Sequence, residues 1–261
     1  MNLTGNSEAN PPGDAGRLTL IFLHHFGGSS RTWTEVTKLL SDRYACLAPD
    51  LRGFGNSDSS SGGFTVKDYA DDVARLIEAA NVESYGLIGH SMGGKIALAL
   101  AARCPSNLHS LILLAPSPPV PEPIPDDERA RLFAAHGDRA AACETLRKLT
   151  TRPLPEAIFR RTVEDTLRCS PQAWRAWLER GSREDISADV ASIDVPVLVV
   201  AGEKDETITV ELLRREVVGR INGARITTLP DVRHLLPLEA PAEVAGLIDD
   251  HSSIRNARKS R

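Results

Sequence analysis

A serine with a glycine two residues to either side, in Gly89-His90-Ser91-Met92-Gly93, is the clearest candidate for chemistry in this chain of 261 residues. An apolar run precedes the motif and the alanine-rich run 95–101 follows it, which predicts a strand, a sharp turn and a helix. The glycines leave out side chains where strand and helix approach closely, and a strained turn lifts the Ser91 hydroxyl out of the sheet. The motif therefore predicts a nucleophile rather than a mere packing turn.

Ser91 needs a base, because a neutral hydroxyl is a poor nucleophile. Of the seven histidines, His234 is the best placed, since it follows the apolar run 225–229 and so lies at the carboxyl end of a predicted strand. Open α/β sheets gather their sites at that edge. An imidazole, whose ordinary pKa is about 6.5, can act first as base and then as acid near neutral pH. His90 adjoins Ser91 and is expected to point away from it.

The histidine in turn needs a carboxylate to orient it. The loop 201–206, after the apolar run 195–200, reads Ala-Gly-Glu-Lys-Asp-Glu and offers three acids. Asp205 best suits the chain order serine, acid, histidine. Glu203 is the alternative acid, and a solvated charge cluster with no catalytic role is the alternative for the whole loop.

The elements that must position these residues follow from an alternation of short apolar runs with stretches of helical spacing. This alternation predicts the α/β class, with a mostly parallel, doubly wound sheet and helices on both faces. The predicted strands are 18–23, 44–48, 85–88, 111–114, 195–200 and 225–229, and the predicted helices are 32–40, 66–80, 95–103, 210–218 and 242–250.

The pattern changes in residues 118–188, which have helical spacing but no convincing strand and begin with a run of prolines. We expect an inserted helical cap there, because proline cannot continue a strand ladder. The core is then 17–117 and 189–251. Residues 1–16, rich in Asn, Gly, Pro and Ser, and residues 252–261, which carry charge without apolar partners, are expected to be a flexible leader and a flexible tail.

The composition points to small-molecule chemistry. With a formal net charge of −4, the chain has no general attraction for nucleic acid. No run approaches the ~20 apolar residues that cross a membrane, and the amino terminus lacks the features of a secretory signal. The four cysteines show no CxxC pairing. We therefore expect a cytoplasmic protein that binds neither nucleic acid nor membrane, and the oligomeric state is left open.

Five segments in order along the chain resemble the α/β-hydrolase superfamily. They are 23–29 (its oxyanion loop), 49–57 (its turn after the next strand), 89–94 (its nucleophile turn), and 202–205 and 234–239 (its acid and histidine). The resemblance implies an α/β-hydrolase fold and an esterase-like serine hydrolase that needs no cofactor or metal. It also implies an oxyanion hole formed by the backbone amides of Phe26 and Met92.

The chain departs from the family pattern in two places. His25 occupies a position where glycine is common, so it is expected to pack over the oxyanion loop, to reach the substrate or to stiffen the loop. The two-strand hairpin that usually precedes the oxyanion strand has no counterpart in residues 1–16, which predicts a shortened sheet edge.

These features together predict cleavage of a carboxylic ester or related acyl bond of a small, largely apolar substrate through an acyl-enzyme. Trp174 and Trp177, three residues apart in the cap, would share a helix face and either pack in the core or contact the ligand. A lactonase, a perhydrolase or cofactor-free haloperoxidase, or a carbon–carbon bond hydrolase would use the same residues. A ligand-binding homologue without turnover is the alternative from a different class.

Overall fold

The computed structural model describes residues 17–58 and 62–253. Residues 1–16, which were expected to be a flexible leader without the amino-terminal hairpin, lie outside the described residues, and so does most of the expected tail. The last helix extends to Ser253, so that Ser252 and Ser253, which were expected in the tail, are helical.

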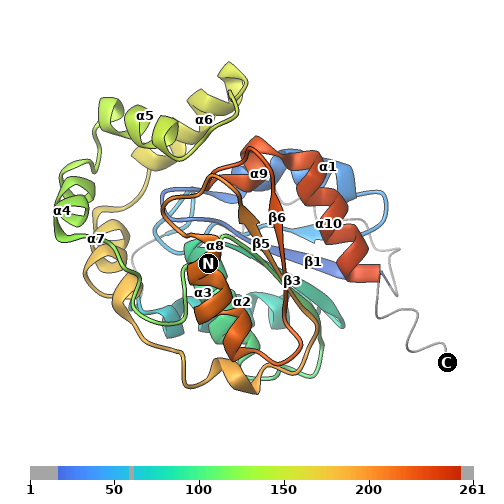
Figure 1. Cartoon of the computed structure of the whole chain (residues 1–261). Helices are drawn as coiled ribbons and strands as arrows, with labels where there is room; N and C mark the ends of the chain where they lie inside the picture. Colours follow the sequence, from blue (N-terminus) through green and yellow to red (C-terminus); the bar gives the residue numbers. More distant parts are fainter. Residues whose placement is uncertain (1–16, 59–61, 254–261) are drawn as a thin grey trace.

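The centre of the molecule is a six-stranded sheet in which every pair of neighbouring strands is parallel (Figure 1). The strand order is β2-β1-β3-β4-β5-β6. From β1 the chain first adds β2 on one side and then adds β3 to β6 on the other, which confirms the doubly wound α/β class. The strands are β1 (Thr19–Leu23), β2 (Ala45–Leu47), β3 (Tyr85–His90), β4 (Leu108–Leu114), β5 (Val197–Gly202) and β6 (Arg225–Leu229).

Helices cover both faces of the sheet, because successive side chains of a buried strand point to opposite sides. In β1, Ile21 and Leu23 pack into one apolar cluster, whereas Leu20 and Phe22 pack into the other. The first cluster is completed by α2 (Val66–Ala79), α3 (Met92–Ala101) and α8 (Val210–Glu216). The second is completed by α1 (Thr34–Leu40), α9 (Leu236–Glu239) and α10 (Pro241–Ser253).

Four helices lie between β4 and β5 and form a group beside the sheet (Figure 1). Local signals fix several of their ends. The Asp138 carboxylate accepts hydrogen bonds from the amides of Ala140 and Ala141 at the start of α5, and α7 begins with Pro171 after the N-cap residue Ser170. The helices are α4 (Asp126–Ala134), α5 (Arg139–Lys148), α6 (Glu156–Leu167) and α7 (Pro171–Glu179).

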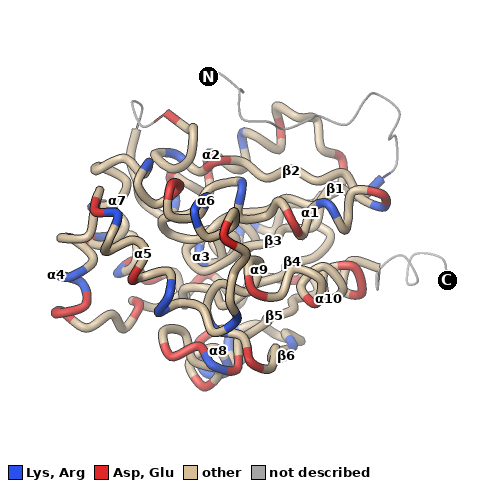
Figure 2. Tube along the Cα trace, turned by 90° about the horizontal axis from the view of Figure 1, so that it is seen from above, with Lys and Arg blue, Asp and Glu red and all other residues tan. Residues whose placement is uncertain are grey.

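Positive and negative side chains are interspersed over the described part of the chain, as Figure 2 shows. Many of them form ion pairs one helical turn apart, such as Lys67 with Asp71 and Arg175 with Glu179. Within the described residues, no helix combines the length and the apolar character that crossing a membrane requires.

Candidate active site

The turn that carries Ser91 joins β3 to α3 directly. The helix begins at Met92, three residues earlier than expected, and Ser91 adopts φ 53° and ψ −117°. A Cβ on Gly89 would lie 2.5 Å from the carbonyl oxygen of Gly93, and a Cβ on Gly93 would lie 2.4 Å from that of Leu23. A side chain at either glycine would therefore collide with the backbone, as expected from the motif. The amino terminus of α3 points its amides toward Ser91.

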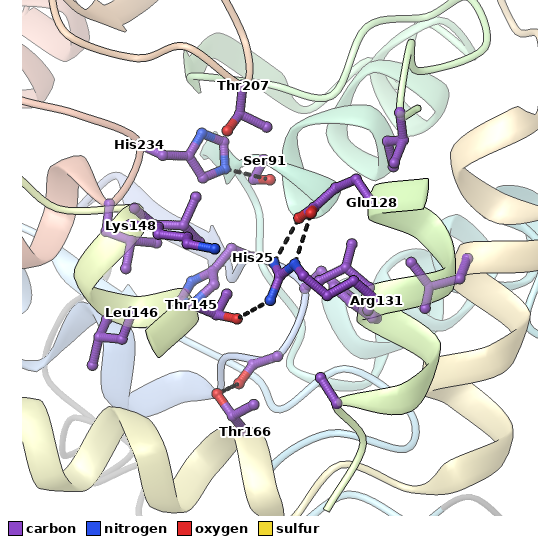
Figure 3. Close-up of a pocket in the computed structure, with 18 of the residues that line it drawn as sticks. His25, Ser91, Glu128, Arg131, Thr145, Leu146, Lys148, Thr166, Thr207 and His234 are labelled. Carbon is purple, nitrogen blue, oxygen red and sulfur yellow. Dashed lines mark hydrogen bonds and ion pairs between the residues drawn. The ribbon is translucent and has the colours of Figure 1, made fainter. Parts of the chain in front are cut away.

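The structure brings Ser91, His234 and Asp205 into one hydrogen-bonded chain. The Nε2 atom of His234 lies 2.9 Å from the Oγ atom of Ser91 (Figure 3). Its Nδ1 atom lies 2.7 Å from the Oδ2 atom of Asp205. Because a carboxylate only accepts, Nδ1 carries the proton and Nε2 accepts one from the serine hydroxyl. This tautomer is the one that can remove a proton from Ser91.

Asp205 is held in place by its own loop. Its Oδ1 atom accepts hydrogen bonds from the amides of Thr207 at 2.9 Å and Ile208 at 3.0 Å, and its side chain is fully buried. Burial alone would raise the pKa of Asp205, but the charge and hydrogen bond of His234 and these two amides outweigh burial and lower it. The carboxyl is therefore ionised at neutral pH. Glu203, the alternative acid, instead pairs with Lys204 at the surface.

His234 is buried, and its environment acts on its pKa in two directions. Burial is the largest influence and lowers the pKa, but the charge of Asp205 and the hydrogen bond to it together raise the pKa above its ordinary value. An imidazole base in this environment can take the Ser91 proton and return it within one reaction cycle.

The loop after β1 is shaped by His24 and closes next to Ser91. The Nδ1 atom of His24 donates to the carbonyl oxygen of His25 at 2.8 Å, while its Nε2 atom accepts from the amide of Leu51 at 3.0 Å. Among the described residues, the amides of Phe26 and Met92 donate to no group. Phe26 and Ser91 line the same cavity, and Met92 directly follows Ser91. Two free backbone amides at such a place can hold an oxygen as it gains charge.

A cavity of about 640 Å³ opens above Ser91 between the sheet and the four helices that follow β4. His234 and Ser91 lie on one side of it, and the ion pair of Arg131 with Glu128 from α4 lies across from them (Figure 3). Its walls are largely apolar and include Phe26, Leu132, Leu146, Leu149, Trp174 and Trp177.

A family model described as "Alpha/beta hydrolase family" matches residues 20–247. The chain belongs to the alpha/beta hydrolase family. Over 223 residues it is 28% identical to the 2-(acetamidomethylene)succinate hydrolase of Mesorhizobium japonicum, a match that covers 77% of this chain and 80% of that protein.

Solved structures similar to this alpha/beta hydrolase include two esterases. One, from Thermogutta terrifontis, superposes with a TM-score of 0.75 at 26% identity and covers 89% of this chain and 88% of that chain. The other, from Exiguobacterium antarcticum, superposes with a TM-score of 0.82 at 20% identity and covers 90% and 92% of the two chains. The second likeness is one of fold alone.

In this alpha/beta hydrolase, Trp174 and Trp177 do share a face of α7, as their spacing predicted. The ring of Trp174 lies 4.3 Å from the ring of Phe26, centroid to centroid, and that of Trp177 lies 6.4 Å from it. Both are buried in the main core and both line the cavity. A side chain that packs in the core and also lines the cavity can do both, so packing and contact with a ligand do not exclude each other for these two residues.

His25, the departure from the family pattern, is buried and also lines the cavity. Its ring lies 5.0 Å from the ring of His90, and its Nδ1 atom has no partner among the described residues. Burial and the neighbouring histidines hold the pKa of His25 well below its ordinary value, so the ring is neutral. A Cβ on Gly28 would lie 2.6 Å from the His25 ring, so this side chain occupies the space that Gly28 leaves empty.

Two positioning residues of this hydrolase were missed by sequence reasoning. His90 does point away from Ser91, as expected, but its Nε2 atom then donates to the carbonyl oxygen of His234 at 2.8 Å, and burial lowers its pKa to about 3. The carbonyl oxygen of Leu149, at the end of α5, accepts from the amide of His234 at 3.1 Å. No local pattern signals a contact between segments so far apart in sequence.

Within residues 17–58 and 62–253, no group of His, Cys, Asp and Glu side chains is placed to hold a metal ion.

Proposed function

We propose that this hydrolase cleaves a carboxylic ester or related acyl bond of a small, largely apolar substrate, with Ser91 as the nucleophile. The observation that carries the proposal is the 2.9 Å contact between Ser91 Oγ and His234 Nε2, made while Asp205 holds Nδ1 at 2.7 Å. Three side chains from three loops share this chain of hydrogen bonds, and its order is the one that activates a serine.

In the first half of the reaction, His234 takes the Ser91 proton as Oγ attacks the carbonyl carbon. The carbonyl oxygen becomes an oxyanion that accepts hydrogen bonds from the amides of Phe26 and Met92. The protonated His234 then gives its proton to the leaving alcohol, and the carbon–oxygen bond breaks to leave an acyl group on Ser91. In the second half, His234 takes a proton from water, the resulting hydroxide attacks the acyl group, and Ser91 regains its proton.

The cavity supports a small substrate with apolar parts. Its volume of about 640 Å³ is within the range of ~300–1,000 Å³ typical of small-molecule sites. Its aromatic walls, Phe26, Trp174 and Trp177, favour alkyl or aromatic groups over sugars. The Thermogutta terrifontis structure, at 26% identity, is an esterase by name, which agrees with the cleavage of an ester.

In other proteins of this fold, a serine, an acid and a histidine also cleave lactones or carbon–carbon bonds or carry out peroxide-dependent reactions. The shape and chemistry of the cavity, rather than Ser91, Asp205 and His234, therefore determine the type of reaction. A panel of esters, lactones, thioesters and peroxide-dependent halogenation separates these reactions.

Labelling with a fluorophosphonate probe tests the proposal. The wild type should be labelled and should hydrolyse p-nitrophenyl butyrate, whereas Ser91→Ala should do neither. Ser110→Ala, which removes another buried serine, is the matched control and should be labelled like the wild type. A wild type that is neither labelled nor active on short-chain esters would leave a ligand-binding homologue without turnover as the better interpretation.

A further inference from the structure

Glu122 is a carboxyl group that lines the same cavity as Ser91 and has no part in the mechanism above. It belongs to the β4–α4 linker, which we define as residues 115–125. Two backbone hydrogen bonds fix this linker: the amide of Ser117 donates to the carbonyl oxygen of Ser91 at 2.9 Å, and the amide of Glu122 donates to that of Ser182 at 2.7 Å. The backbone that carries Glu122 is thereby tied to the nucleophile turn.

The orientation of the Glu122 side chain is fixed as well. Its Oε2 atom accepts a hydrogen bond of 2.6 Å from the hydroxyl of Ser117, which is fully buried. Its Oε1 atom has no hydrogen-bond partner among the residues that the structure describes. Each oxygen of a carboxyl group has acceptor positions, so the Oε1 atom of Glu122 remains available to a ligand.

The other acids that line the cavity are already paired. Glu128 accepts two hydrogen bonds from Arg131, at 2.6 and 2.7 Å, and Glu206 pairs with Arg233 at 3.3 Å. The ion pairs of the described residues include none to Glu122. Among the described acids that line the cavity, Glu122 is therefore the one without an ion pair, and its Oε1 atom can accept a hydrogen bond.

The charges around Glu122 indicate which kind of donor it suits. Burial is the largest influence on the pKa of Glu122 and raises it. The hydrogen bond from Ser117 and the charges of protonated His234, Lys95 and Arg129 act in the opposite direction without outweighing burial. Two cationic side chains, Lys95 and Arg129, therefore already act on this carboxyl group at neutral pH. An ammonium group on the substrate would be repelled by them, whereas a neutral hydroxyl would not.

We propose that Glu122 is a specificity-determining residue that accepts a hydrogen bond from a hydroxyl group of the substrate, so that hydroxylated esters are preferred. The proposal rests on the proposed function of Ser91. A site built to bind a substrate hydroxyl rejects the analogue that lacks it, because the polar group of the site is then left without a partner.

Matched ester pairs test the assignment on both sides of the scissile bond. The acyl side is tested with p-nitrophenyl 3-hydroxybutyrate against p-nitrophenyl butyrate, and the alcohol side with 3-hydroxypropyl butyrate against propyl butyrate. In the wild type, at least one hydroxylated ester should have a kcat/KM about tenfold or more above that of its match. Glu122→Leu should bring this ratio close to one, whereas Glu122→Gln, whose amide oxygen still accepts, should keep part of it.

Because the readout is a ratio within one variant, a loss of folded protein does not affect it. Ser117→Ala, which frees the carboxyl from its fixed orientation, should lower the same ratio and replaces Glu122→Leu if that variant does not fold. Glu206→Leu is the matched control, an acid of the same cavity that is already paired, and it should keep the wild-type ratio.

Equal rates for both members of each pair in the wild type, or a preference that survives Glu122→Leu, would overturn the role of Glu122 and leave the Ser91 mechanism standing. A stronger preference for p-nitrophenyl 3-aminobutyrate than for the hydroxy ester would overturn the choice of a neutral donor. If no ester is hydrolysed and the fluorophosphonate fails to label Ser91, the proposed function fails, and this inference fails with it.

Discussion

The carboxylate of Asp165 in α6 accepts a 2.7 Å hydrogen bond from the hydroxyl of Ser29, which follows the loop that presents Phe26. The other oxygen of Asp165 accepts from Arg31 Nε at 3.0 Å, and the carboxylate is buried. One side chain of α6 thus holds both Ser29, at the end of the loop that presents Phe26, and Arg31, in the helical turn after it. The position of the loop amides depends on where α6 lies.

Asp165→Ala should break the contacts that α6 makes with Ser29 and Arg31. It leaves the Ser29 hydroxyl without its acceptor and Arg31 without its counter-ion, so we expect the free energy of unfolding to fall by about 2 kcal/mol. Because the loop that carries the Phe26 amide loses its tether, kcat for p-nitrophenyl butyrate should fall. Urea unfolding and steady-state kinetics measure the two effects. Glu164→Ala, the exposed neighbour on the same helix, should change neither, and equal stability of the two variants would contradict the tether.

Asp205→Asn should lower kcat by about 10³-fold or more, because an amide at this position can donate to Nδ1 and so favour the wrong tautomer of His234. Glu203→Gln is the matched control two residues earlier, and its kcat should stay within about twofold of the wild-type value. Both are measured with p-nitrophenyl butyrate. A silent Asp205→Asn together with an impaired Glu203→Gln would transfer the role of the acid to Glu203.

The pH dependence of kcat/KM should reflect the environment of His234. Only the neutral imidazole can take the Ser91 proton, so activity should rise with pH through the pKa of His234, which Asp205 raises above its ordinary value of 6.5. The inflection is therefore expected above pH 6.5. In Asp205→Asn the residual activity should show its inflection at a lower pH, because the negative charge that raises the pKa is gone. Identical inflections in both proteins would contradict this assignment.

Much of the fold was predictable because buried parallel strands appear in the sequence as short apolar runs. All six predicted runs coincide with a strand, to within three residues at each end. The start of α3 was predicted at residue 95, three residues too late, because Gly93 and Gly94 have a low helix propensity and no apolar side chain that would show helical spacing. Close packing requires glycine at these positions, since a Cβ on Gly94 would lie 2.5 Å from the side chain of Pro116. Tertiary packing overrides local propensity at this turn.

The candidate site was predictable only in part. Chain order and strand ends were enough to place Ser91, Asp205 and His234 at one edge of the sheet, and the structure brings them into contact. The contacts that hold them come from elsewhere: Leu149 in the inserted helices binds the amide of His234, and Glu122 comes from a proline-rich linker. Such contacts depend on how the inserted helices dock, which no local periodicity encodes.

Gly28→Ala should show that His25 and the oxyanion loop are packed as one unit. The new methyl group would lie 2.6 Å from the His25 ring, so either the ring or the loop must move, at a cost of about 1–3 kcal/mol in the free energy of unfolding. His25→Ala in the same chain makes room for the methyl group, so the double variant should lose less than the sum of the single losses. Gly246→Ala in α10, where the added Cβ meets nothing, is the control. Additive losses on urea unfolding would show that the two residues are independent.

Lys95 should give the protein an unusual dependence of stability on alkaline pH. Its side chain is buried one turn after Ser91, and its Nζ atom donates to the carbonyl oxygens of Val120, before the inserted helices, and of Glu184, after them. Burial lowers its pKa from 10.5 to about 8. Below pH 8 the folded and unfolded chains are both protonated at Lys95, so the cost of burying the charge is fully present and constant.

Between pH 8 and 10.5 only the unfolded chain still holds this proton, and a state that binds fewer protons gains stability as the pH rises. The difference in free energy of unfolding between the wild type and Lys95→Met should therefore shift in favour of the wild type by about 2 kcal/mol from pH 7.5 to 10. Urea titrations at several pH values measure the shift, with the exposed Lys38→Met as the control that should show none. A difference that stays constant across this window would mean that the Lys95 ammonium keeps its proton when buried, held by the two carbonyl groups.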